Sequence, residues 1–233
     1  MSNAPVPTPL PLRTGFDLTR ESPFTYECRG CAKCCYGKAI PVNPYEVARI
    51  AGVLALSTTD VLERFTQAGG AYLRTEADRA CVFLREGRCS VHAGRPLACR
   101  LYPLGRQLKG REERFAEVVP HPESTGLYGK EGTVRDWLSA QGVDAYIAAN
   151  DRYVALLGRL LEAVARCGDL PGVSEEASLA LSRAPVPSDE SLLDMDAVVA
   201  RWCAERGLPV PTDVGRRTEI HLEAVESIIA RMG

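Results

Sequence analysis

The first clear pattern of apolar positions lies in residues 43–54, NPYEVARIAGVL. Asn43 is a good N-cap for a helix, and Pro44 suits the first helical turn. The apolar stripe of this segment consists of Val47, Ile50 and Leu54. The pattern predicts a helix, and the sequence STTDVLERF predicts a second one that begins at Ser57 or Thr58.

Helical spacing is most regular in residues 143–168. Its apolar positions are Tyr146, Ile147, Tyr153, Leu156, Leu157, Leu160, Leu161 and Val164. Gly168 is well placed as the C-terminal cap of this helix. Shorter helices are expected at residues 174–183, 192–207 and 211–232, with a Pro-rich linker at residues 184–191.

Strand patterns are confined to the middle of the chain. The sequence CVFLREGRCSVH predicts two short strands around a turn at Glu86–Gly87, and RFAEVVPH predicts another short strand. We therefore expect an α+β fold that is mostly helical. Its expected core is an irregular cysteine-rich region with a short hairpin, packed against a helical C-terminal half.

Composition narrows the class of protein. The 233 residues carry 28 basic and 30 acidic side chains, a net charge of −2, which gives no reason to expect nucleic acid or an anionic membrane as a partner. No apolar run approaches the length of a membrane span, and the Pro-rich N-terminus does not resemble a secretory signal. The expectation is a soluble, cytoplasmic protein.

Cysteine is the residue type that carries the chemistry. Seven of the nine cysteines lie between Cys28 and Cys99, and the stretch ECRGCAKCC holds four of them. In a reducing compartment, and with an odd number of thiols, metal ligation is favoured over disulfide bonding.

The spacing within ECRGCAKCC favours a metal centre. Cys28, Cys31 and Cys34 form an arc of three thiolates that suits an iron–sulfur cluster or tetrahedral zinc. Because adjacent side chains are expected to diverge, Cys34 and Cys35 are poorly placed to bind a single ion together. The loop is therefore expected to serve one polynuclear cluster or more than one centre.

Further ligands are expected from Cys81, Cys89 and Cys99. Seven thiolates exceed one four-coordinate site and nearly fill two, so Cys167 is an eighth candidate. Burial as a small apolar residue is the competing interpretation for Cys167, and the favoured one for Cys203 beside Trp202.

Basic residues surround both cysteine groups and would lower the pKa of thiols. They are Arg29, Lys33 and Lys38 in the first group, and Arg85, Arg88, Arg95 and Arg100 in the second. Of the three histidines, His92 follows Cys89 at a zinc-ligand spacing, whereas His121 and His221 have no paired motif.

The segments CRGCAKCC and CVFLREGRCSVHAGRPLACRLYP resemble the YkgJ-like cysteine-cluster family, a zinc- or iron-chelating domain family named for its Cys-x-x-Cys-x-x-Cys-Cys signature. The resemblance runs from about Phe24 to Pro103. It implies a metal domain whose ligands are Cys28, Cys31, Cys34, Cys35, Cys81, Cys89 and Cys99. His92 stands where the family usually has an aromatic residue, which argues against His92 as an essential ligand.

The resulting expectation has three regions: a Pro-rich arm at residues 1–22, a cysteine-cluster domain at residues 23–125 and a helical region at residues 126–233. The expected cofactor is an iron–sulfur cluster of the [4Fe–4S] type, with zinc as the alternative. Arg95 and Arg100 are expected to support the cluster loop.

Three functions fit this reading of the sequence. The first is electron transfer or redox chemistry with an unidentified protein partner. The second is a structural zinc module that builds a protein-binding surface. The third is a metal-dependent enzyme that modifies proteins, with the cluster near a substrate pocket. Some larger relatives in the family are flagellin lysine methylases, but the resemblance does not cover enough of this chain to imply that activity.

Overall fold

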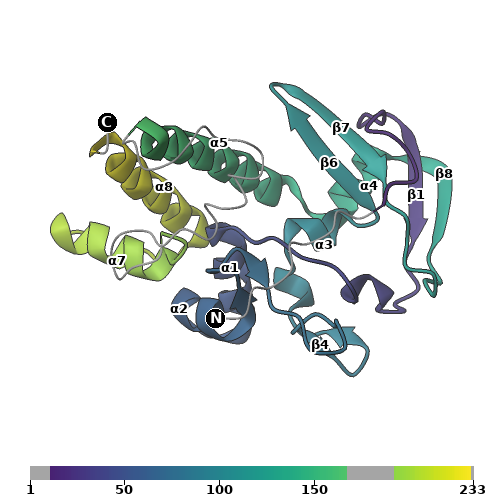
Figure 1. Cartoon of the computed structure of the whole chain (residues 1–233), viewed down its shortest axis with the longest axis horizontal. Coiled ribbons are helices and arrows are strands. Elements are labelled where there is room, and N and C mark those ends of the chain that lie inside the picture. The colour runs from purple at the N-terminus through teal and green to yellow at the C-terminus, as the bar shows by residue number, and fades with distance from the viewer. Residues whose placement is uncertain (1–10, 167–191, 232–233) are drawn as a thin grey trace. The chain divides into compact units, whose positions relative to one another are not determined.

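The structure is a computed structural model that describes residues 11–166 and 192–231 (Figure 1). The chain forms two compact units. The first unit combines the residues up to Pro41 with Leu73–Ala145, and the second combines Val42–Tyr72 with the residues from Tyr146 onward. The chain thus leaves the first unit after the first cysteine group and returns to it before the second.

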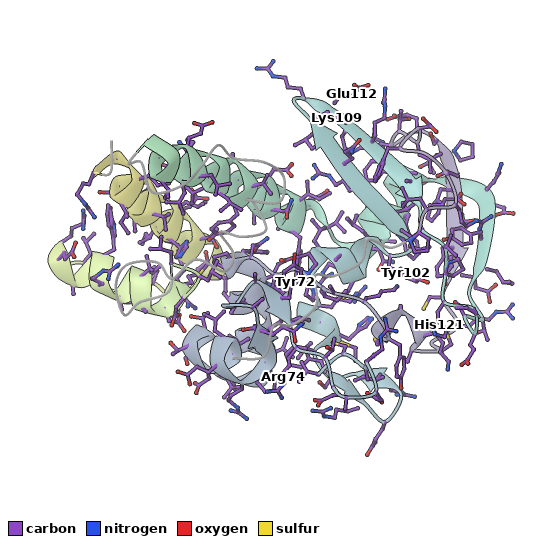
Figure 2. The ribbon with its side chains drawn as sticks, in the orientation of Figure 1. Tyr72, Arg74, Tyr102, Lys109, Glu112 and His121 are labelled. Atoms are coloured by element: carbon purple, nitrogen blue, oxygen red, sulfur yellow. The ribbon has the colours of Figure 1, made fainter. Side chains whose placement is uncertain are left out.

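The first unit contains two antiparallel strand pairs of five to seven residues per strand. Strand β1 (Pro23–Glu27) pairs with β8 (Leu127–Thr133), and β6 (Leu104–Lys109) pairs with β7 (Glu112–Glu117). The predicted strand in RFAEVVPH is part of β7. Figure 2 labels Lys109 and Glu112, the pair that closes the β6–β7 hairpin beside Gly110 at φ 61°.

Aromatic side chains fill the space beside β1. Phe24 is fully buried, and its ring meets Tyr128 and Trp137 edge to face at centroid distances of 6.2 and 5.9 Å. Trp137 belongs to α4 (Val134–Gln141), which begins in a capping box between Thr133 and Asp136. Burial of these large rings is a main source of stability for this unit.

Short elements connect the strand pairs. They are η1 (Lys33–Cys35), the hairpin of β4 (Leu84–Arg85) with β5 (Arg88–Cys89), η2 (His92–Gly94) and α3 (Leu97–Leu101). The predicted turn at Glu86–Gly87 is confirmed, and both residues have positive φ. Part of the expected N-terminal arm is ordered, because Leu12 bridges to Val118 and Leu18 to Phe115.

Helices dominate the second unit. The predicted helices are α1 (Pro44–Leu54), α2 (Thr58–Phe65), α5 (Asp144–Arg166), α7 (Met195–Glu205) and α8 (Val214–Arg231). Two short strands, β2 (Thr66–Gln67) and β3 (Tyr72–Leu73), follow α2. The predicted caps are confirmed, since Asn43 forms a capping box with Glu46 and Ser57 forms one with Asp60.

Residues from helices far apart in the chain form the core of this unit. The buried cluster comprises Ala48, Met195, Val199, Cys203 and Ile220. Cys203 is fully buried, as the sequence predicted. The predicted apolar stripe of α5 is narrower than expected, because Leu157 is 45% exposed.

The N-termini of α2 and α7 cap one another. The hydroxyl of Thr58 donates to Asp194 at 2.6 Å, and the Thr58 amide donates to the carboxylate of Asp196 at 2.7 Å. The amide of Asp196 in turn donates to the Thr58 hydroxyl at 2.9 Å. Carboxylates near helix N-termini are favourable for both helices because they accept hydrogen bonds from otherwise unpaired amides.

Helices with small antiparallel sheets confirm the α+β class. The expected cysteine-rich core is not confirmed, because the cysteines of the first unit are half-buried or exposed, whereas Phe24, Phe115 and Val82 are fully buried. Among the described residues, no helix combines the length and the apolar character needed to cross a bilayer. The helix and linker expected at residues 174–191 and the cap at Gly168 lie outside the described residues.

His221 of α8 is a buried histidine in the second unit. Its Nε2 lies 3.0 Å from the carbonyl oxygen of Leu192, so Nε2 must carry the proton and donate. Nδ1 then accepts from the Tyr153 hydroxyl at 3.1 Å. Burial holds the pKa of His221 at about 4, so the ring is neutral near pH 7.

This burial predicts a loss of stability on acidification. The unfolded chain binds a proton at His221 below about pH 6.5, whereas the folded chain does so only below about pH 4. The stabilisation is complete above pH 6.5 and is lost as the pH falls toward 4. H221Q should reduce the slope of unfolding free energy against pH by up to about 1.4 kcal/mol per pH unit in this window.

Urea unfolding at several pH values between 4.5 and 6.5 measures that slope. The control is H121Q, which removes a half-buried histidine of the first unit. An unchanged slope in H221Q would show that His221 is not buried in its neutral form.

Candidate metal centre

The first cysteine loop follows β1 directly. Gly30 at φ 65° and Ala32 at φ 56° turn the backbone, and η1 begins after Ala32. The amide of Cys35 donates to the carbonyl of Ala32 at 2.9 Å, which closes the short helix. This local geometry places Cys34 and Cys35 together at the end of the loop.

Backbone pairing joins this loop to the second cysteine group. The amide of Cys81 donates to the carbonyl of Cys35 at 2.8 Å, and Tyr36 and Ala80 form an isolated antiparallel bridge. One step further, the amide of Gly37 donates to the carbonyl of Arg79 at 2.9 Å. Three consecutive residues of the first loop are therefore held against the segment that ends in Cys81.

Cys89 and Cys99 come from the two elements that follow. Cys89 lies on β5, where it pairs with Leu84 across the hairpin. Cys99 lies in the short helix α3, and its amide donates to the carbonyl of Pro96 at 3.0 Å. The hairpin was predicted from its turn residues, but the helix that carries Cys99 was not.

The thiols of the first unit form two groups. Cys34, Cys35, Cys81, Cys89 and Cys99 act on one another electrostatically, and we call them the five-thiol group. Cys28 is exposed, and Cys31 contacts a different loop. All eight cysteines that the structure describes are free thiols, and Cys167 lies outside the described residues. Within the described ranges, no three Cys, His, Asp or Glu side chains are already closed around one ion position.

Cys34 and Cys35 do not diverge as the sequence led us to expect. A hydrogen bond from the Cys35 thiol to the sulfur of Cys34 lowers the pKa of Cys34 to about 6, with further help from Lys38. The same hydrogen bond raises the pKa of Cys35. The two pKa values shift in opposite directions because two adjacent buried thiolates would repel each other.

Backbone amides two residues downstream support several sulfurs. The amide of Phe83 stabilises the Cys81 thiolate and the amide of Val91 stabilises that of Cys89, although burial raises the pKa of both thiols. An N–H group directed at sulfur stabilises a bound thiolate and a protein-held metal cluster alike. This donor arrangement fits a thiolate-ligated metal centre.

Cys31 has its own set of donors. The amide of Thr125 contributes most to lowering the pKa of Cys31, with the amide of Lys33 and the hydroxyls of Thr125 and Ser124 adding to it. The Ser124 hydroxyl lies 3.9 Å from the sulfur, and an ion pair between Lys33 and Glu123 holds the same loop. Sequence reasoning missed Ser124 and Thr125, since nothing in the local pattern indicates this tertiary contact.

Arg100 ties together the loop that leads to Cys99. It donates from Nε to the carbonyl of Arg95 at 3.0 Å, from Nη1 to that of Gln141 at 2.7 Å and from Nη2 to that of Ala93 at 2.7 Å. Arg95 donates to the Gln141 side chain at 2.7 Å and lies 3.0 Å from Nδ1 of His92. These contacts fit the expected loop-supporting role of Arg95 and Arg100, although no sequence pattern indicates that Gln141 takes part.

The two remaining histidines of the motif region make other contacts. His92 faces Arg95, and burial lowers its pKa, with the charges of Arg95 and Arg100 adding to the effect. His121, labelled in Figure 2, accepts from the amide of Glu123 through Nδ1 at 3.1 Å. Neither histidine belongs to the five-thiol group.

Comparison with known proteins agrees with this geometry. Residues 27–120 match the model of the CxxCxxCC family, whose description is "Putative zinc- or iron-chelating domain". The matched segment contains both groups of thiols. The resemblance inferred from the sequence is confirmed for this segment, and the match supports metal binding in general.

The chain is also similar to a protein from an archaeon. The chain is 31% identical over 118 residues to Uncharacterized protein MJ0661 of Methanocaldococcus jannaschii, over 48% of this chain and 64% of that protein. The chain therefore spans slightly less than two thirds of the length of this relative. No solved structure matches the chain.

We expect R100K to destabilise the first unit. Lysine cannot reach three carbonyl groups at once, so the loss should be about 2 kcal/mol, in the range of hydrogen bonds made by charged groups. Urea unfolding measures it. The matched control is R85K, because Arg85 is exposed and donates a hydrogen bond to the carbonyl of its neighbour Leu84, so the substitution should change stability by less than about 0.5 kcal/mol. Equal effects of the two substitutions would contradict the role of Arg100.

Proposed function

We propose that the first unit binds a metal centre through thiolates drawn from the five-thiol group, and that an iron–sulfur cluster is its preferred occupant. The observation that carries the proposal is the hydrogen-bonded pairing of Cys35 with Cys81, together with the electrostatic influence that Cys34, Cys35, Cys81, Cys89 and Cys99 exert on one another from four separate segments of the chain. The proposed ligands would be drawn from this set. The expectation that Cys28 and Cys31 are also ligands stays a prediction.

The residues around the site fit an anionic, sulfur-ligated group. Amides are directed at Cys81 and Cys89, and the ammonium group of Lys38 interacts with Cys34, Cys35 and Cys99. A centre held by four thiolates carries net negative charge, so it needs such donors in a partly buried position. The residues present therefore fit the implied centre.

The donor set favours iron–sulfur over zinc. Five thiols with no histidine among them suit an iron–sulfur cluster, which proteins hold mainly by cysteine thiolates. Zinc accepts the same ligands, and a structural zinc site is the alternative. An iron–sulfur cluster would supply one-electron chemistry or brace the fold, while the chain itself holds the thiolates, shields them from water and fixes the Cys99 loop through Arg100.

Metal analysis tests the proposal directly. Protein purified without oxygen should contain iron and acid-labile sulfide and show visible absorption. Colourless protein with stoichiometric zinc would assign the structural zinc site instead. Protein that contains neither metal, and that binds neither on reconstitution, would contradict the proposal.

We expect C81S and C99S to lower metal content and stability together. Because metal-binding energy adds to folding energy, a loss of about 2–3 kcal/mol should lower the melting temperature by roughly 4–12 °C. Elemental analysis and thermal melting measure the two effects. The control is C203A, which removes a buried thiol of the second unit and should leave the metal content unchanged.

The same assays on C31S test whether the metal ligands also include a thiol outside the five-thiol group. Metal loss in C31S would extend the ligand set to the first part of the loop, as the sequence predicted. Full metal content in both C81S and C99S would rule out the five-thiol group as the binding site.

A further inference from the structure

The ammonium group of Lys38 has no hydrogen-bond partner in the described parts of the chain. Its Nζ atom is buried, and it makes no hydrogen bond to any residue in the described parts of the chain. Nζ lies 3.4 Å from the centroid of the Tyr102 ring, a cation–π contact (Tyr102 is labelled in Figure 2). A buried ammonium group without a hydrogen-bond acceptor is unfavourable, so this position calls for an explanation.

The groups that act on Lys38 are thiols. Cys34, Cys99 and Cys35 favour its charged form, and burial opposes them and lowers the pKa of Lys38 to about 8. The influence of Lys38 on Cys34 is also visible in the lowered pKa of that thiol. The ammonium group thus lies within electrostatic reach of three members of the five-thiol group.

The backbone that places the thiols also places Lys38. It follows Gly37, which has φ 65° and donates its amide to the carbonyl of Arg79 at 2.9 Å. The hydrogen bond between Gly37 and Arg79 extends the backbone pairing of the same two segments that also joins Cys35 to Cys81. Lys38 is therefore positioned by the same short pairing that brings the two cysteine segments together.

Other cations near the thiols already have partners. Lys33 forms an ion pair with Glu123. Arg95, which acts on Cys34 and Cys89, binds the Gln141 side chain and the carbonyl of His92. In contrast to Lys33 and Arg95, Lys38 makes no hydrogen bond in the described parts of the chain, so its N–H donors are available to a ligand of the thiols.

We propose that Lys38 is a positioning residue of the metal centre, whose ammonium group donates hydrogen bonds to metal-bound sulfur and offsets the negative charge of the centre. This inference rests on the proposed function. Groups of this kind next to metal ligands typically change metal affinity by about 10–100-fold. The tyrosine ring would keep the ammonium group in place when no metal is bound.

The test uses the full chain, reduced and metal-free, with Co²⁺ as the probe and Zn²⁺ as the competitor. We expect K38M to bind Co²⁺ roughly 10–100-fold more weakly than the unmodified protein, as followed by visible absorption. K38R keeps the charge and should recover most of the affinity. The control K109M changes an exposed lysine of the β6–β7 hairpin and should bind like the unmodified protein.

Thermal melting distinguishes this role from a purely structural one. Methionine removes an unfavourable buried charge, so metal-free K38M should melt at the same temperature as the unmodified protein or higher. Adding Zn²⁺ should raise the melting temperature of K38M by less than it raises that of the unmodified protein. If K38M lowers the melting temperature of both forms equally and leaves Co²⁺ affinity unchanged, the role assigned to Lys38 is wrong.

The same titration separates this inference from the proposed function. If the unmodified protein binds neither Co²⁺ nor Zn²⁺ and also holds no iron and acid-labile sulfide after purification without oxygen, the metal function fails and the inference fails with it. If it holds only iron and sulfide, an equal iron and sulfide content in K38M contradicts the inference. If the unmodified protein binds and K38M binds equally well, only the inference fails.

Discussion

The pairing of residues 35–37 with residues 79–81 is the constraint on which the candidate centre depends. Its central hydrogen bond runs from the amide of Cys81 to the carbonyl of Cys35 at 2.8 Å. Between these segments the chain passes through the helices α1 and α2 of the second unit. Closing so long a connection costs conformational entropy, and a bound metal shared by both segments would offset part of that cost.

Local signals in the sequence predicted the local structure well. Asn43 and Ser57 cap helices because each has a carboxylate three residues later to complete a capping box. Glu86–Gly87 forms a hairpin turn because glycine adopts positive φ without strain. These features depend on a few neighbouring residues, so one sequence is enough to predict them.

Contacts between distant segments could not be predicted in the same way. Thr58 and Asp194 cap each other's helices, and Thr125 donates to Cys31, yet neither pair has a common spacing or motif. The expected divergence of Cys34 and Cys35 was wrong because it assumed an ordinary loop, whereas the η1 turn after Ala32 lets the two thiols share a hydrogen bond. The motif therefore identified the candidate ligands, and tertiary packing determined which of them lie together.

The electrostatics of the five-thiol group show what the polypeptide provides by itself. Burial raises the pKa of Cys81 and Cys89, and the shared hydrogen bond raises that of Cys35 while it lowers that of Cys34, so without a metal these four thiols do not all favour the charged form. The amides and Lys38 are arranged to stabilise more negative charge than one thiolate supplies. A bound metal ion would provide this additional negative charge indirectly, because it displaces the thiol protons and holds the sulfurs together as thiolates. The buried ammonium group of Lys38, which has no hydrogen-bond acceptor in the described parts of the chain, is thus a more specific indication of a bound metal than the number of cysteines.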